Sequence, residues 1–195
     1  MQSPSCLIMM NLMNNNNMDT IDNFLIDGQP VVTLDNDLFL KKDGKTFIDQ
    51  IEDYFKQIGG IAHCQFGDII LDRKGAQNDK AHGMSRVKAI SFAAIVPTLE
   101  KGVVILPLGQ YHTNDKKQET GMIAAPILIA GERYICVVVV ICNKKEKRLY
   151  VHESFLFKKI HEALASSLVH DGNAMSPELR GNIANVLNNY LTSKQ

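Results

Sequence analysis

The fold is decided by the stretch MIAAPILIAGERYICVVVVICNKKEKRLYVHES, residues 122–154. Two apolar runs on either side of the turn-forming pair Gly131-Glu132 predict a β-hairpin. The polar run NKKEK predicts a second turn, which leads into a further strand over residues 148–154. Because CVVVVIC is apolar at every position, it is expected to form a central strand covered on both faces. With the apolar run VVILPL upstream, the pattern predicts an antiparallel meander.

The chain before the meander predicts helices. Residues 45–60 carry apolar side chains at three- and four-residue spacing and end in Gly59-Gly60, which is the pattern of an amphipathic helix. Residues 67–72 predict a brief strand, and residues 73–79 predict a polar loop.

Further helices are expected next to the meander and after it. One should run from Val87 to about Val96, because Pro97 disfavours helical backbone in the residue before it. Pro97 then suits the first turn of a second short helix that Gly102 ends. Residues 155–170 and 176–191 predict two C-terminal helices. The predicted class is therefore α+β.

The predicted organisation is one domain with an extension at each end. Residues 1–28 contain a polar run of asparagines and are expected to form a disordered leader. Residues 29–157 are long enough to bury a core of their own. Residues 158–195 are expected to form a C-terminal helical extension.

Composition limits the classes of function. The chain carries 21 basic and 21 acidic residues, so any nucleic-acid site must be a local patch rather than a general basic surface. The cysteines contain no CxxC pair and are expected to be reduced, as in a cytoplasmic protein; they are Cys6, Cys64, Cys136 and Cys142. Zinc-site spacings and membrane-spanning segments are not found in the sequence, which predicts neither a metal nor a membrane partner.

A first group of polar residues lies at the start of the helix predicted from Val87. His82, Ser85, Arg86 and Lys88 fall within seven positions. At 100° per residue, Ser85, Lys88 and Phe92 share a face roughly opposite Val87, Ile90 and Ala94. Phe92 could therefore pack beneath the sheet or offer a stacking surface to a base. The alternative for the whole group is an ordinary polar helix start.

A second group lies on the strand RLYVHES. Alternation along a strand places Arg148, Tyr150, His152 and Ser154 on one face. These side chains are costly to bury over an apolar core, so the face should meet water or a cleft. Two histidines with basic and phenolic neighbours suit metal-independent RNA cleavage, in which one group removes the 2′-OH proton and another protonates the 5′-oxygen. Both groups could also form an anion-binding surface without chemistry.

The segment 67–154 resembles the barnase–EndoU–colicin–RelE-like nuclease domains of large polyvalent proteins in phages and conjugative elements. The stretches that carry the resemblance are GDIILDRKGAQNDKAHGMSRVKAISFAAIVPTLEKGVVI, IAAPILIAGERYICVVVV and KRLYVHES. The resemblance implies helices packed on a four-stranded antiparallel sheet. It also implies RNA cleavage to a 2′,3′-cyclic phosphate, without a metal or another cofactor.

Carried over to this chain, the resemblance implies a divided active site. His82 and His152 are the acid–base candidates, Lys88 and Arg86 would bind phosphate, and Tyr150 would position the substrate. The supporting substrate contacts would be Ser85, Arg148 and Glu153. The protein would act on RNA as a toxin or effector of mobile-element origin, with a cognate antitoxin or immunity protein as a further partner. The alternative is a catalytically inactive RNA- or protein-binding module of the same fold.

Overall fold

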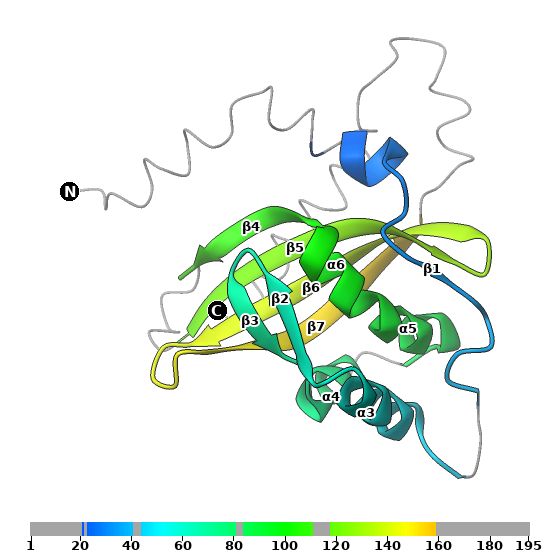
Figure 1. Cartoon of the computed structure of the whole chain (residues 1–195), viewed down its shortest axis with the longest axis horizontal. Helices are drawn as coiled ribbons and strands as arrows, with labels where there is room; N and C mark the ends of the chain where they lie inside the picture. The colour runs from blue at the N-terminus through cyan, green and yellow to red at the C-terminus, as the bar shows by residue number, and fades with distance from the viewer. Residues whose placement is uncertain (1–20, 22, 41–43, 81–83, 111–117, 159–195) are drawn as a thin grey trace.

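A mixed β-sheet organises the molecule. The structure is a computed structural model that describes residues 21, 23–40, 44–80, 84–110 and 118–158. Within these ranges seven strands form one sheet in the order β1-β5-β6-β7-β3-β2, and β4 pairs with β5 (Figure 1). The strands are β1 Thr33–Leu34, β2 Ile61–Cys64, β3 Gly67–Ile70, β4 Val103–Gly109, β5 Gln118–Ile129, β6 Glu132–Asn143 and β7 Arg148–Lys158.

The sheet overturns the predicted architecture of N-terminal helices on a four-stranded antiparallel sheet. Strands β4 to β7 form an antiparallel meander, but β3 lies parallel to β7 and β1 lies parallel to β5. The three added strands also alternate with the helices along the chain. The protein is therefore mixed α/β, with a sheet of seven strands in place of the four predicted.

Helices α3 to α6 lie together on one face of the sheet (Figure 1). They are α3 Phe47–Gln57, α4 Arg73–Lys80, α5 Arg86–Ser91, the 3-10 turn η1 Phe92–Ala94 and α6 Ile95–Lys101. Helix α3 confirms the amphipathic prediction: Thr46 caps its first turn, and Ile48, Ile51 and Phe55 are buried. We call this face the helix side.

Three local predictions are wrong. The polar segment predicted as a loop forms α4, which packs on β7 so closely that a Cβ on Gly75 would lie 3.0 Å from the Val151 carbonyl oxygen. The helix expected to begin at Pro97 begins two residues earlier, at Ile95. Strand β7 continues to Lys158, where a helix was expected from residue 155 onward. The rest of that predicted helix, and the one after it, lie outside the described residues.

The core has two parts, one on each face of β6. Val138 and Val140 belong to the helix-side core, while Val137 and Val139 belong to a core on the opposite face. All four are essentially inaccessible to solvent, which confirms the prediction of a central strand covered on both faces. The opposite core also contains Leu25, which is fully buried and belongs to a short helical segment over residues 23–27. In the part of the chain that the structure covers, no helix is long and apolar enough to cross a membrane.

Candidate functional site

Strand β7 contains a β-bulge at His152. Val139 of β6 lies opposite Glu153, and Val140 lies opposite Val151, so His152 has no partner of its own in the register. The extra residue reverses the alternation of side chains beyond it. Ser154 consequently lies opposite Val138, on the helix side, and is only 1% exposed. The prediction that Ser154 shares a face with Tyr150 is therefore wrong.

The other polar residues of β7 gather on the face away from the helices. Tyr150 lies opposite Ile141, which alternation places on the same face as Val139 and Glu153. His152 is on this side too, because its Nε2 lies 3.9 Å from Oε1 of Glu153, whereas neighbours in a regular strand point apart. The His152 side chain is 26% exposed and that of Glu153 is 9% exposed. We call Arg148, Tyr150, His152 and Glu153 the polar face of β7.

The hydroxyl of Tyr150 is held as a donor. It donates a hydrogen bond of 2.9 Å to Oε2 of Glu146. This carboxylate raises the pKa of Tyr150, burial adds to the rise, and Arg148 opposes it. Because a phenol already titrates near pH 10, Tyr150 stays protonated at neutral pH and can give a proton or a hydrogen bond, but cannot act as a base.

The turn between β6 and β7 concentrates positive charge. Residues 144–148, which we call the basic turn, read Lys-Lys-Glu-Lys-Arg and are all exposed. Lys144 pairs with Glu119 at 3.2 Å, but within the described residues no carboxylate pairs with Lys145 or Lys147. Oδ1 of Asn143 accepts hydrogen bonds from the backbone N–H groups of residues 145 and 146, which fixes the shape of the turn.

The residues predicted at the start of the helix mainly build structure. Ser85 caps α5 by accepting a hydrogen bond from the backbone N–H of Lys88. The guanidinium of Arg86 donates to Asn36 and to the carbonyl oxygens of Leu38 and Phe39, and so anchors the turn over residues 36–39. These hydrogen bonds within the protein explain the position of the Arg86 guanidinium without a bound phosphate.

Phe92 also belongs to the structure rather than to a surface. It is fully buried, and its ring lies 6.3 Å from that of Phe55 in the helix-side core. Of the two interpretations of Phe92, packing beneath the sheet is confirmed and the base-stacking surface is wrong.

The two predicted groups do not meet within the described residues. Helix α5 packs through Ala89 and Ile90 into the helix-side core, whereas the polar face of β7 lies on the other side of the sheet. Lys88 and His152 therefore belong to different faces of the molecule. His82 lies outside the described residues, so its proximity to His152 stays a prediction.

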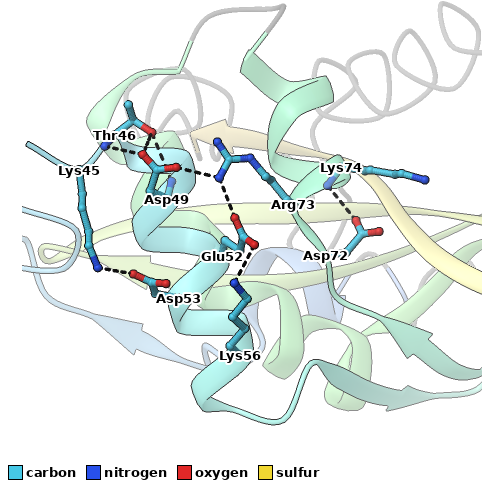
Figure 2. Close-up of polar contacts among 9 residues, drawn as sticks. All are labelled: Lys45, Thr46, Asp49, Glu52, Asp53, Lys56, Asp72, Arg73 and Lys74. Carbon is cyan, nitrogen blue, oxygen red and sulfur yellow. Dashed lines mark hydrogen bonds and ion pairs between the residues drawn. The ribbon is translucent and has the colours of Figure 1, made fainter.

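A charge network on α3 and α4 was not predicted. Nη1 of Arg73 lies 2.7 Å from Asp49 and 2.7 Å from Glu52, and Figure 2 shows the guanidinium between these two carboxylates. Thr46 donates a 2.6 Å hydrogen bond to Asp49, while Lys56 pairs with Glu52 at 2.8 Å. The network joins the first residue of α4 to the surface of α3. In the sequence, the only signal for this network was that the charged residues of α3 are three or four positions apart, a spacing that places them on one face of a helix.

Acid is expected to weaken this network. The hydrogen bond from Thr46, followed by Arg73, lowers the pKa of Asp49 from 3.8 to about 2. A carboxyl whose pKa is lower in the folded chain adds stability above its ordinary pKa and loses it as the pH falls through the folded value. In thermal unfolding between about pH 4 and about pH 2, wild type should lose more stability than Asp49→Asn. Asp37→Asn, at an exposed carboxylate without an ion pair in the described residues, should match wild type. Parallel losses in all three proteins would contradict the assignment.

Comparison with known proteins does not assign this chain to a family. No protein-family model, no curated protein and no solved structure matched this chain. Among the described residues, no group of three or more His, Cys, Asp or Glu side chains is placed to hold a metal ion. The resemblance to barnase–EndoU–colicin–RelE-like nucleases therefore stays a prediction that rests on the quoted motifs alone.

Proposed function

We propose that the protein binds single-stranded RNA through the basic turn and the adjoining polar face of β7. The observation that carries the proposal is the local charge: four of five consecutive exposed residues are basic in a chain of zero net charge. Contacts between Lys or Arg and phosphates supply most of the affinity of non-specific nucleic-acid binding. RNA inside the cell as the target would place the protein in the cytoplasm.

The neighbouring side chains support RNA over other polyanions. The basic turn is fixed between two long paired strands, with Asn143 opposite Arg148 as the last pair of the ladder. Tyr150 lies two residues further along the same face, where a phenol ring can stack on an unpaired base. Arg148 can bind phosphate through two parallel hydrogen bonds. Phosphate anchors beside an aromatic side chain are the combination that single-stranded nucleic acid requires.

Neutralising the basic turn tests this proposal. Lys145→Gln/Lys147→Gln should weaken binding of a labelled single-stranded RNA, measured by fluorescence anisotropy over a range of salt concentrations. Two lost phosphate contacts should reduce the slope of log affinity against log salt by about 1.4, at ~0.7 for each contact. The matched control is Lys74→Gln/Lys101→Gln, which removes the same charge from exposed sites on α4 and α6. Equal effects of the two double variants would show that only total charge matters.

The pair formed by His152 and Glu153 favours RNA cleavage as a second candidate function. An imidazole beside a carboxylate can serve as a proton acceptor, and Nε2 of His152 lies 3.9 Å from Oε1 of Glu153. In the proposed step His152 takes the 2′-OH proton and the 2′-oxygen bonds to phosphorus. The bond from phosphorus to the 5′-oxygen breaks, and an acid protonates that oxygen, which leaves a 2′,3′-cyclic phosphate and a 5′-hydroxyl. Such an activity would suit a toxin or effector of mobile-element origin that a cognate antitoxin or immunity protein restrains.

A further inference from the structure

A pocket of about 350 Å³ lies between α3 and the turn over residues 36–39. Its aromatic and aliphatic wall consists of Leu38, Phe39 and Tyr54. Its polar wall is a stripe of α3, in which Gln50 and Gln57 are two helical turns apart. The volume lies at the lower end of the range for small-molecule sites, which suits a ligand with one or two rings. The basic turn is on a distant part of the molecule (Figure 1), so the pocket is a separate site.

The aromatic wall is held in a strained conformation. Phe39 has a φ of 52°, a left-handed backbone conformation that is unusual for a bulky residue. Hydrogen bonds from Arg86 to the carbonyl oxygens of residues 38 and 39 hold it there. The Phe39 ring then meets that of Tyr54 edge to face, with centroids 5.8 Å apart. Strained backbone of this kind is found mainly at binding and active sites, where contacts with the surrounding structure hold the residue in its unfavourable conformation.

The polar wall contains an unused hydrogen-bonding group. Within the described residues, Nε2 of Gln50 is buried and has no hydrogen-bond partner. Buried amide nitrogens are nearly always paired, so an unpaired one that borders a pocket calls for a ligand. Rotation of the carboxamide exchanges its oxygen and nitrogen, which lets Gln50 present a donor and an acceptor to a bound molecule.

The rim of the pocket favours an uncharged ligand. Nζ of Lys45 lies 2.6 Å from Oδ2 of Asp53, and Figure 2 shows this ion pair on the surface of α3. Both residues line the pocket, and their charges cancel. A phosphorylated ligand would therefore find no net positive charge at the rim.

We propose that this pocket binds the adenine ring of a free nucleoside. Adenine offers an amino donor at N6 beside an acceptor at N7, which is the complement of a glutamine carboxamide. Its flat ring can stack on one of the two perpendicular rings, Phe39 or Tyr54, and meet the other edge to face, as unpaired bases stack on aromatic residues. The proposal does not depend on RNA binding at the basic turn.

Calorimetric titration of the full chain with adenosine, AMP and uridine tests the proposal. Adenosine should bind, AMP should bind no more tightly than adenosine, and uridine should bind more weakly. Gln50→Glu replaces the donor with a second acceptor and should weaken adenosine binding by about tenfold or more. Gln77→Glu makes the same chemical change on exposed α4 and should leave adenosine binding unchanged. Circular dichroism of each variant confirms that it is folded.

A second variant at the rim keeps the test decisive if Gln50→Glu does not fold. Asp53→Asn at this partly exposed position removes one charge of the rim, so AMP should then bind more tightly than adenosine. The proposal is overturned if wild type does not bind adenosine or binds all three compounds equally. It is also overturned if Gln50→Glu, folded, binds adenosine as wild type does, or if Asp53→Asn does not change the preference between adenosine and AMP.

Discussion

Phe92→Ala is expected to lower the free energy of unfolding by about 3–5 kcal/mol. Phe92 is among the largest fully buried side chains, and it packs against Phe55 where η1 meets α3. Removal of its ring leaves a cavity that the surrounding helices and sheet cannot fill without moving. Urea or guanidinium denaturation followed by circular dichroism measures the loss.

Two comparisons separate this packing effect from a general effect of mutation. Phe92→Leu retains most of the buried volume and should cost much less than Phe92→Ala. Ile58→Ala, at a side chain that is 38% exposed, should change stability by less than about 1 kcal/mol. If Phe92→Ala were as stable as wild type and bound RNA less tightly, Phe92 would be a stacking residue after all, and its placement in the core would be wrong.

The sequence predicted the elements whose signals are local and long. Strands β5 and β6 are 12 residues each, and the turn at Gly131 has a φ of 80°, which glycine adopts without strain. Helix α3 combines a capping threonine with a buried stripe at helical spacing. In these segments hydrophobic periodicity and turn chemistry favour the same structure, so sequence alone is sufficient.

The missed elements depend on partners that are distant in sequence. Strand β2, of four residues, was not predicted. Residues 29–42 predicted one or two short strands and residues 67–72 a brief strand, where β1 and β3 lie, but their parallel pairing with strands far along the chain was missed. Helix α4 has a polar sequence, and it is stable where it is because Gly75 permits close packing on β7 and Arg73 binds the carboxylates of α3. Neither contact leaves a periodic signature in the segment itself.

The candidate site was also predicted incompletely, because its geometry depends on residues that are distant in sequence. The residues VHES alternate as a regular strand would, so the bulge at His152 and the reversal at Ser154 are visible only in the pairing with β6. Arg86 was recognised as a cation, but its acceptors are oxygens of residues 36–39, about 50 positions earlier, and most of them are backbone carbonyls that carry no sequence signal. The basic turn, by contrast, can be recognised in the sequence as a local cluster of basic residues. The sequence pattern was nevertheless interpreted only as a link between two strands.

If the second candidate function is correct, His152→Ala is expected to reduce chelator-resistant cleavage of RNA by at least about a hundredfold, the usual contribution of a general acid or base. The assay incubates purified protein with total RNA in the presence and absence of a chelator. His82→Ala and the double variant should show similar losses if His82, as predicted from the sequence, is the other proton-transfer group. Effects of groups that act in one step are not additive, so the double variant should be little worse than either single one.

The control for this experiment is a histidine with a carboxylate partner elsewhere on the sheet. His63 of β2 lies 2.7 Å from Asp68 of β3 and is well exposed, so His63→Ala removes a comparable pair at the far edge. It should leave cleavage unchanged. Anisotropy measurements should also show that His152→Ala loses far less RNA binding than cleavage, because the lysines of the basic turn, which supply most of the affinity, are intact. Equal cleavage by wild type and His152→Ala would mean that His152 is not catalytic. Loss of binding in step with cleavage would instead mean that His152 only helps to bind RNA, which leaves the protein as a binding module.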